Sequence, residues 1–333
     1  MKRLLSLLLV ALVGASACGG SGDDDTGEAT PSAEGFPVTI EHKYGTTEIP
    51  APPERVVSVG FNDQDTILAL GTVPVGIRDW YGDQPDATWP WAHDLLDGAE
   101  PEVLPADELN VEAVAALDPD LIVGVSSGMT AEEYETLSAI APTLAQSGDF
   151  IDYGMPWQDQ TLMIGEALGR ADEAEAMIAE VEDRYATIRA DVPDLAGAEA
   201  TVSYVMDESQ IGAYGPEDAR SRLLTDLGMV IPPEIADLAG DQFYSQFSRE
   251  QIGLLDRDVL IWITSEPGIV EQIQADPLRQ QLDAVAQGRE IFLTDMESGA
   301  ASFSSVLSLP YLLDTLVPKL AAAADGDPST PVG

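Results

Sequence analysis

An internal repeat is the feature of this sequence that most constrains its fold. The segment EAVAALDPDLIV (112–123) aligns without gaps with EQIGLLDRDVLI (250–261), at an offset of 138 residues, the difference between 250 and 112. The two segments share a Glu, a Leu and two Asp, and their apolar residues match at positions typical of a buried strand. Asn110 and Ser248 precede them as suitable N-caps, so each segment is predicted to form a short helix leading into a strand. The chain is therefore expected to contain two duplicated α/β halves.

Strand and helix patterns alternate along both halves, which favours parallel sheets covered by helices. The first half is expected to begin with a hairpin over 38–41 and 46–49, followed by a strand over 55–59 and a helix over 65–70. Between the halves, apolar residues on one face predict a helix over about 172–190, roughly 28 Å long at about 1.5 Å per residue. The expected fold class is α/β, with two Rossmann-like lobes that have parallel sheets and are joined by a single long connecting helix.

The N-terminus has the layout of an export signal. Lys2 and Arg3 precede an apolar run over 4–13, and the sequence ASAC then ends at Cys18, the single cysteine of the chain. A run of this length covers about 15 Å of a hydrocarbon core of about 30 Å, so it is too short to span a bilayer. The ASAC sequence resembles a bacterial lipobox, which makes Cys18 the predicted lipidation site. No thiol then remains for a disulfide, a metal site or a nucleophile.

These patterns divide the chain into six predicted segments. The segments are a lipoprotein signal peptide (1–17), the lipidated cysteine with a disordered tether (18–35), an N-terminal lobe (36–150), a connecting helical segment (151–192), a C-terminal lobe (193–320) and a disordered tail (321–333). The tether is predicted because its Gly-, Ser- and Asp-rich sequence has no large apolar residue and cannot bury enough surface to fold.

Acidic residues dominate the composition. The chain has 59 Asp and Glu against 15 Lys and Arg, which gives a formal net charge of −44. Such a surface repels nucleic acid and acidic lipid headgroups, and it disfavours polyanionic ligands unless salt screens the charge. We interpret the acidic surface as an adaptation to high salt. We expect contact with the membrane only through the lipid anchor, and no nucleic-acid partner.

Several further motifs occur in an order and spacing that are specific when taken together. They are Arg55-Val56-Val57, NVEAVAALDPDLIV (110–123), IGEALGR (164–170), Tyr214-Gly215, Phe303-Ser304 and SLPYLLD (308–314). Together they resemble the iron-siderophore branch of the solute-binding proteins of ABC importers, whose lobes are joined by one long helix and whose relatives bind ferric siderophores, haem or cobalamin. The resemblance implies a monomeric extracytoplasmic receptor, lipid-anchored to the outer face of the cell membrane, that delivers a ferric siderophore to the importer permease.

The resemblance also assigns a role to the glutamates of the repeat. In cobalamin-binding relatives, one Glu on each lobe pairs with arginines of the permease, and these positions fall on Glu112 and Glu250. Ion pairs of this kind fix the register of an interface even when their net energy is small. The alternative is that acids in the first turn of a helix merely favour its dipole.

Candidate ligand-binding residues lie mainly in loops that follow predicted strands, where open α/β lobes bind ligands. After the first strand this rule selects Asn62, Asp63 and Gln64, and the next loop, DWYGDQPDATWPWAHDLL (79–96), is rich in aromatic residues typical of ligand clefts. A ferric siderophore brings its iron already coordinated, so the protein needs aromatic surface and guanidinium donors rather than metal ligands or a cofactor. The candidates are Arg78, Trp80, Tyr81, Trp89, Trp91, Ser127, Met129, Tyr153, Tyr214, Arg220, Arg222, Tyr244, Trp262 and Phe303. Core packing is the alternative for the aromatic residues, and salt bridges are the alternative for the arginines.

Hydroxamate siderophores fit the charge of this chain better than catecholates or citrate. Their ferric complexes are neutral or weakly cationic, whereas the other complexes are anionic and would face a net negative field. Haem or cobalamin is the alternative ligand within the same fold. Haem would need an axial Tyr or His, and Tyr153, Tyr214 or Tyr244 could supply one.

A serine hydrolase is the alternative from another class of protein. The sequence GVSSG (124–128) matches G-x-S-x-G after a predicted strand, with Ser126 as nucleophile. In that fold the histidine follows the serine, but His42 and His93 both precede Ser126, so the triad fails and we expect no enzyme. Two scattered histidines also do not supply a receptor site for bare zinc or manganese.

Overall fold

The computed structural model describes residues 35–264 and 268–325, together with residues 330 and 332. The predicted signal peptide, Cys18 and the tether up to residue 34 lie outside the described residues. The described parts of both lobes belong to one compact unit. No helix within these residues combines the length and the hydropathy needed to cross a membrane.

The N-terminal lobe is built on a five-stranded parallel sheet with the strand order β5-β4-β3-β6-β7. The strands are β3 (Val56–Ser58), β4 (Gly76–Arg78), β5 (Glu102–Leu104), β6 (Leu121–Gly124) and β7 (Thr143–Ala145). Every residue of β3, β4, β6 and β7 is buried, as expected for a parallel sheet that is covered on both faces. The helices of this lobe are α1 (Asp63–Ala69), α2 (Pro90–His93), α3 (Val111–Ala116) and α4 (Ala131–Ser138). The predicted hairpin is confirmed as the antiparallel pair β1 (Val38–His42) and β2 (Gly45–Ile49).

The C-terminal lobe contains a second five-stranded sheet, with the order β10-β9-β8-β11-β12. Its strands are β8 (Ala200–Val205), β9 (Gln210–Tyr214), β10 (Tyr244–Ser248), β11 (Val259–Trp262) and β12 (Glu290–Phe292). The helices are α7 (Ala219–Asp226), α8 (Pro233–Ala239), α9 (Ile269–Gln274), α10 (Asp283–Ala286) and α11 (Asp295–Phe303). The α/β fold class with two sheets and a long helix is confirmed.

The second sheet differs from the expected one because it is mixed. Strands β8, β11 and β12 are parallel, but β9 pairs antiparallel with both β8 and β10. The reason lies in the short link between β8 and β9, in which the Asp207 carboxylate accepts hydrogen bonds from the backbone N–H groups of Ser209 and Gln210. A link this short can only make a hairpin, since parallel neighbours need a crossover of about a dozen residues or more.

Both copies of the repeat form the predicted helix and strand. The first copy is α3 leading into β6, and the second is a 3-10 helix over Arg249–Leu255 leading into β11. Both predicted N-caps are present, because the side chains of Asn110 and Ser248 accept hydrogen bonds from backbone N–H groups of the following turn. The second helix is tighter than the first. It has Gly253 where the first copy has Ala115, and glycine lowers helix propensity.

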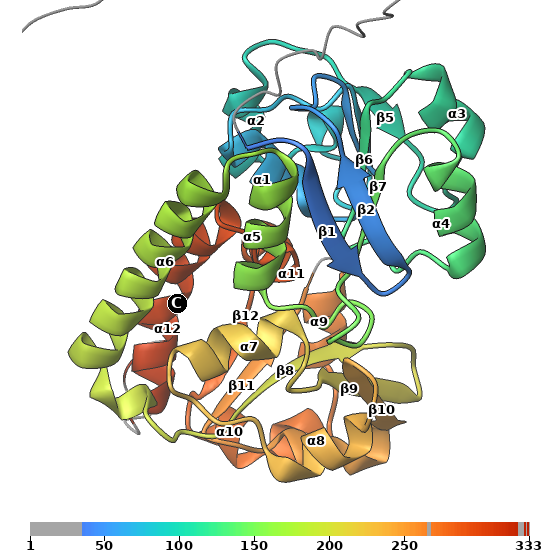
Figure 1. Cartoon of the computed structure of the whole chain (residues 1–333). Helices are drawn as coiled ribbons and strands as arrows, with labels where there is room; N and C mark the ends of the chain where they lie inside the picture. Colours follow the sequence, from blue (N-terminus) through green and yellow to red (C-terminus); the bar gives the residue numbers. More distant parts are fainter. Residues whose placement is uncertain (1–34, 265–267, 326–329, 331, 333) are drawn as a thin grey trace, which may run out of the picture. The chain divides into compact units, whose positions relative to one another are not determined.

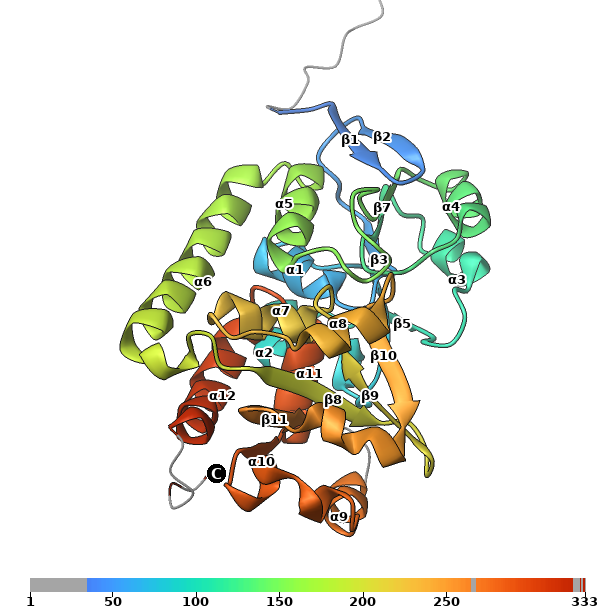
Figure 2. The same ribbon diagram turned by 90° about the horizontal axis from the view of Figure 1, so that it is seen from below.

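The lobes are connected through α5 (Trp157–Ala167) and the long helix α6 (Ala171–Asp191), which confirms the helix predicted over 172–190. The last helix, α12 (Ser308–Ala324), lies beside α6 in both Figure 1 and Figure 2. An ion pair between Arg184 and Asp314 joins the two helices. Leu320 and Ala323 are buried and α12 continues to Ala324, so residues 321–324 belong to this helix and not to the predicted tail.

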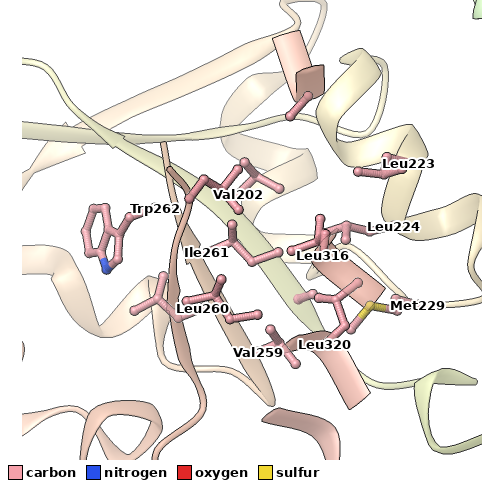
Figure 3. Close-up of a cluster of buried hydrophobic side chains, with 14 of the residues drawn as sticks. Val202, Leu223, Leu224, Met229, Val259, Leu260, Ile261, Trp262, Leu316 and Leu320 are labelled. Atoms are coloured by element: carbon pink, nitrogen blue, oxygen red, sulfur yellow. The ribbon is translucent and has the colours of Figure 1, made fainter. Parts of the chain in front are cut away.

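The largest core lies in the C-terminal lobe, between its sheet and the helices that cover it (Figure 3). In Figure 3, Ile261 points toward Leu316 of α12, whereas Trp262 points to the other side of β11, as alternation along a strand requires. Trp262 is 1% exposed, and its Nε1 donates to Glu290 Oε1 at 2.8 Å. Trp262 is therefore a core residue.

Candidate ligand-binding site

A cavity of about 300 Å³ lies between loops of the two lobes. The N-terminal lobe contributes residues that follow β3, β4 and β6, which is the carboxyl edge where the sequence placed the site. The lining residues are Phe61, Asn62, Trp80, Val125, Ser126, Gln146, Tyr153, Met155, Gln160, Asp218, Ala219, Arg220, Phe243 and Ser302. The volume is at the lower end of the range for small-molecule sites, about 300 to 1,000 Å³.

Aromatic rings form a continuous wall around the cavity. The ring centroids of Phe61 and Trp80 are 5.4 Å apart, those of Phe61 and Tyr153 are 6.1 Å apart, and those of Tyr153 and Phe243 are 5.5 Å apart. Phe303 lies behind Trp80, at 5.4 Å between centroids. Because Phe243 belongs to the C-terminal lobe, the wall spans both lobes and presents apolar faces to a ligand.

Tyr153 reaches this wall from an unusual backbone conformation. Its φ is 64°, in the left-handed region that non-glycine residues rarely adopt. Its hydroxyl lies over Gly128, where a Cβ atom would come within 2.1 Å of the Tyr153 oxygen, so only glycine fits at that position. Tyr153 is 38% exposed and lines the cavity, so it is available for contact with a ligand.

Arg220 is the cation of the cavity wall, and Asp218 holds it. The Arg220 Nη1 donates to Asp218 Oδ2 at 2.9 Å, its Nε donates to Ser302 Oγ at 3.3 Å, and its guanidinium carbon lies 4.2 Å from the ring centroid of Tyr214. Asp218 is also the N-cap of α7, since its Oδ1 accepts from the backbone N–H of Arg220 at 2.8 Å. Burial lowers the pKa of Arg220, but Asp218, Tyr214 and Tyr81 together raise it above its usual value. Burial raises the pKa of the Asp218 carboxyl, and the charge and hydrogen bonds of Arg220 oppose the rise. Because a guanidinium keeps its proton and bonds directly to this carboxyl, the pair is held in place and ionised.

Arg78 lies behind the aromatic wall and does not line the cavity. Its guanidinium carbon is 4.5 Å from the ring centroid of Phe61, and its Nη2 donates to the backbone oxygen of Ala106 at 2.8 Å. Burial lowers the pKa of Arg78, and the charges of Tyr153 and Glu133 oppose that change. The ring of Phe61 therefore separates Arg78 from the cavity.

The candidates from the sequence differ in how close they lie to the cavity. Trp80, Tyr153 and Arg220 line the cavity. Residues that contact lining residues from behind are Tyr81, Tyr214, Tyr244 and Phe303, whereas Trp89 and Trp91 stack on each other at 5.0 Å one layer further out. Ser127, Met129 and Trp262 are buried in the lobes, and Arg222 pairs with Glu217 and donates to the backbone oxygen of Gly154.

Several lining residues were not among the sequence candidates. Phe61 was not named, but it directly precedes Asn62, which the rule for the loop after the first strand had selected and which also lines the cavity. Ser126 lies in the loop after the strand that ends at Gly124, a loop that the sequence had indicated through Ser127 and Met129. Phe243 carries no local signal, because it precedes an edge strand of the other lobe and reaches the cavity only through the tertiary fold.

Ser126 is not arranged as a nucleophile. Its hydroxyl donates to Asp63 Oδ1 at 2.7 Å, and its Oγ accepts from the backbone N–H of Asn62 at 3.2 Å. The ring nitrogens of His42 and His93 bond instead to threonine and tyrosine hydroxyl groups, so neither histidine is hydrogen-bonded to Ser126. Burial raises the pKa of the Asp63 carboxyl, and its hydrogen bonds to Ser126 and Val125 oppose the rise; the resulting pKa is about 6.

Polar contacts beside the cavity join the two lobes. Asn62 Nδ2 donates to the backbone oxygen of Phe303 at 2.7 Å. Asp65 Oδ2 accepts from Trp91 Nε1 at 2.8 Å and from Ser305 Oγ at 2.5 Å, while its Oδ1 is buried with no partner among the described residues. Burial raises the pKa of the Asp65 carboxyl to about 7, although both hydrogen bonds oppose the rise.

This carboxyl makes stability depend on pH. The folded protein holds a proton on Asp65 up to about pH 7, whereas the unfolded chain releases it near pH 4. The free energy of unfolding therefore falls as pH rises through that window. We expect Asp65→Asn to remove this slope and to raise the free energy of unfolding at pH 8 by about 4 kcal/mol, measured by denaturant titration. The Asp63 carboxyl has a lower pKa than that of Asp65, so Asp65 should dominate the pH dependence of the free energy of unfolding between pH 6 and 7. If this dependence is the same in Asp65→Asn and in wild type, its assignment to Asp65 is wrong.

Comparison with known proteins gives consistent matches along nearly the whole chain. The family profile described as periplasmic binding protein matches residues 56–296. "Probable siderophore-binding lipoprotein YfiY" of Bacillus subtilis is 29% identical over 335 residues, which covers 95% of this chain and 98% of that protein. A periplasmic solute binding protein from Mycobacterium smegmatis is 38% identical with a TM-score of 0.78, covering 86% of this chain and 98% of that chain. PiaA from Streptococcus pneumoniae in complex with ferrichrome is 28% identical with a TM-score of 0.75, covering 87% of this chain and 99% of that chain.

Proposed function

This chain belongs to the periplasmic binding protein family, whose members are binding proteins and not enzymes, and we propose that it captures a ferric siderophore outside the cell for an ABC importer. The observation that carries the proposal is the cavity between the lobes, with its wall of Phe61, Trp80, Tyr153 and Phe243 and the guanidinium of Arg220. The names of similar proteins support the ligand class: one is named for siderophore binding, and the structure of another holds ferrichrome.

The chemistry of the wall suits a chelate better than a bare ion. Within the described residues, no group of three or more His, Cys, Asp or Glu side chains could hold a metal. An iron that arrives already wrapped in oxygen ligands instead presents a carbon-rich outer surface and a few carbonyl oxygens. Aromatic faces contact the carbon-rich surface, and the N–H donors of Arg220, Asn62 and Gln160 can form hydrogen bonds to the carbonyl oxygens.

The charge of the lining favours a neutral complex of the hydroxamate type. Among the described residues of the lining, Asp218 and Arg220 are the two charged ones, and they pair with each other, so together they add no net charge to the wall. An anionic complex would gain no unpaired cation there and would approach a chain of net charge −44. Ferric trihydroxamates avoid both penalties.

Haem is the second candidate ligand, because Tyr153 lies on the wall and carries an oxygen that could ligate iron. Burial raises the pKa of the Tyr153 hydroxyl, with Arg78 opposing the rise, which disfavours its ionised form. Tyr214 lies under Arg220 and Tyr244 lies beside Phe243, so neither of these tyrosines faces the cavity directly. The wall therefore supports a siderophore better than haem.

Anchoring and delivery complete the proposal. Cys18 would carry the lipid that holds the receptor, as a monomer, on the outer face of the membrane. Glu112 and Glu250 would contact the permease, since both are exposed and each lies in the first turn of a helix on a different lobe. Two acids placed in this way could fix the register of a permease that spans both lobes.

Tryptophan fluorescence of the mature protein at high salt tests the ligand. We expect saturable quenching by a ferric trihydroxamate, because Trp80 lines the cavity, and no saturable response to the same siderophore without iron. Haem and cobalamin are titrated in parallel. A response to haem or cobalamin alone would change the ligand within the family, and no saturable response to any of the four would contradict the proposal.

A further inference from the structure

We propose that Asp218 is the specificity-determining residue of the cavity, because it cancels the charge of Arg220 and so makes the site select neutral ferric complexes over anionic ones. This inference rests on the proposed function and adds a residue that decides which siderophore class is accepted. Without the carboxylate, Arg220 would be a free cation on the cavity wall, which is the usual means of binding an anionic ligand.

The two side chains are held together so closely that a ligand cannot separate them cheaply. Asp218 accepts from Arg220 Nη1 through both oxygens, at 3.2 Å and 2.9 Å. The side chains are 11% and 3% exposed for Arg220 and Asp218, respectively. The N-cap bond to the backbone of Arg220 and the bond from Arg220 Nε to Ser302 fix both ends of the pair. Because Asp218 caps α7, it cannot turn away without uncapping that helix.

The charges in the next layer do not alter this balance. Arg78 lies behind Phe61, and Asp63 lies behind Ser126, so one cation and one anion stand on the N-terminal side. On the C-terminal side, Glu217 and Arg222 pair with each other outside the lining. Within the part of the chain that the structure describes, Asp218 and Arg220 are thus the charged groups that line the cavity themselves.

An anionic complex in this cavity would bind beside the carboxylate of Asp218. It would share the Arg220 guanidinium with an existing partner and would be repelled by that partner over a few ångströms of poorly hydrated space. A repulsion of this kind lowers affinity by about 10- to 100-fold. A neutral complex experiences no such repulsion and still receives hydrogen bonds from the guanidinium.

Asp218→Asn is the direct test. Asparagine keeps the oxygen that caps α7 and nearly the same volume, while it removes the negative charge. We expect the variant to bind ferric dicitrate, an anion, at least about tenfold more tightly than wild type, and its affinity for neutral ferrichrome to change by less than about threefold. Affinities are measured by titration at a fixed high salt concentration.

Two companion variants separate a local effect from a general one. Glu217→Gln changes net charge by the same amount one residue away, outside the lining, and is expected to leave the ratio of the two affinities unchanged. Adding Arg220→Gln to Asp218→Asn should abolish the gain for ferric dicitrate, because the cation that it depends on is gone. If Glu217→Gln gives the same gain as Asp218→Asn, the effect is that of net charge and the inference is overturned.

The outcomes also distinguish this inference from the proposed function. If the wild type binds neither complex, the proposed function fails. If the wild type binds ferrichrome but Asp218→Asn gains nothing for ferric dicitrate, the specificity role fails and the proposed function stands. If Asp218→Asn does not fold, Asp218→Ser replaces it, because serine also retains a capping oxygen. The same gain in affinity for ferric dicitrate is expected, and its absence would overturn the specificity role.

Discussion

Replacing Trp80 with alanine is expected to weaken the binding of ferrichrome by about 30- to 150-fold, or ~2 to 3 kcal/mol. Trp80 lines the cavity, and its ring is fixed by Phe61, Tyr81 and Phe303 at centroid distances of 5.4, 4.8 and 5.4 Å. A ring held in this way loses little side-chain entropy when a ligand stacks on it. Isothermal titration at high salt measures the loss.

The truncation leaves the fold largely intact if Trp80 acts mainly as a binding surface. Its side chain is only partly buried, so the free energy of unfolding should fall by less than about 2 kcal/mol. A Trp80→Phe variant, which keeps an aromatic face, should recover most of the affinity. Wild-type affinity in a folded Trp80→Ala protein would mean that the ligand binds elsewhere.

Trp262→Ala is expected to have the opposite pattern, with a loss of about 3 to 5 kcal/mol in the free energy of unfolding. Trp262 is 1% exposed in β11, which pairs with both β8 and β12. The variant leaves a cavity in the core and removes the donor that bonds to Glu290, although Arg279 still pairs with that carboxylate. Denaturant unfolding monitored by circular dichroism measures the change.

Affinity provides the control for this second variant. At a temperature where Trp262→Ala remains folded, ferrichrome affinity should stay within about threefold of wild type, because Trp262 is not part of the lining. Trp262→Phe should lose less stability than the alanine variant, since it fills most of the space. Unchanged stability combined with lost affinity would restore Trp262 as a ligand residue.

Much of the architecture could be predicted from the sequence, because the signals involved are local. The repeat at 112–123 and 250–261 predicted both helix–strand units, and the apolar face of 172–190 predicted α6. The antiparallel placement of β9 was missed, although the turn-forming Asp207 and the short link after β8 indicate a hairpin. The length of that link is a local property, so the antiparallel direction of β9 could also have been predicted from the sequence.

The site could be predicted only in outline, because the direction of each ring depends on distant contacts. Trp80 and Trp89 belong to the same loop, but Trp89 is buried against Gly82 and Gly299, where any side chain would clash with its ring. Gly299 is in α11, far away in the sequence. No local pattern could tell which tryptophan faces the ligand, and none could tell that Phe243 completes the wall.

The contacts that Asn62 and Asp65 make with residues 303–305 also set the order in which the chain can mature. The first lobe is synthesised early, yet the contacts of its buried Asp65 carboxyl and of its layer around Trp91 are completed by Ser305, Leu307 and the start of α12. Domains generally fold as they emerge, N-terminal first. In this protein the N-terminal lobe stays incompletely packed until nearly the whole polypeptide has been synthesised. A chain that ends before its last helix therefore leaves apolar and polar groups of the N-terminal lobe without their partners, and chaperones and proteases can recognise them.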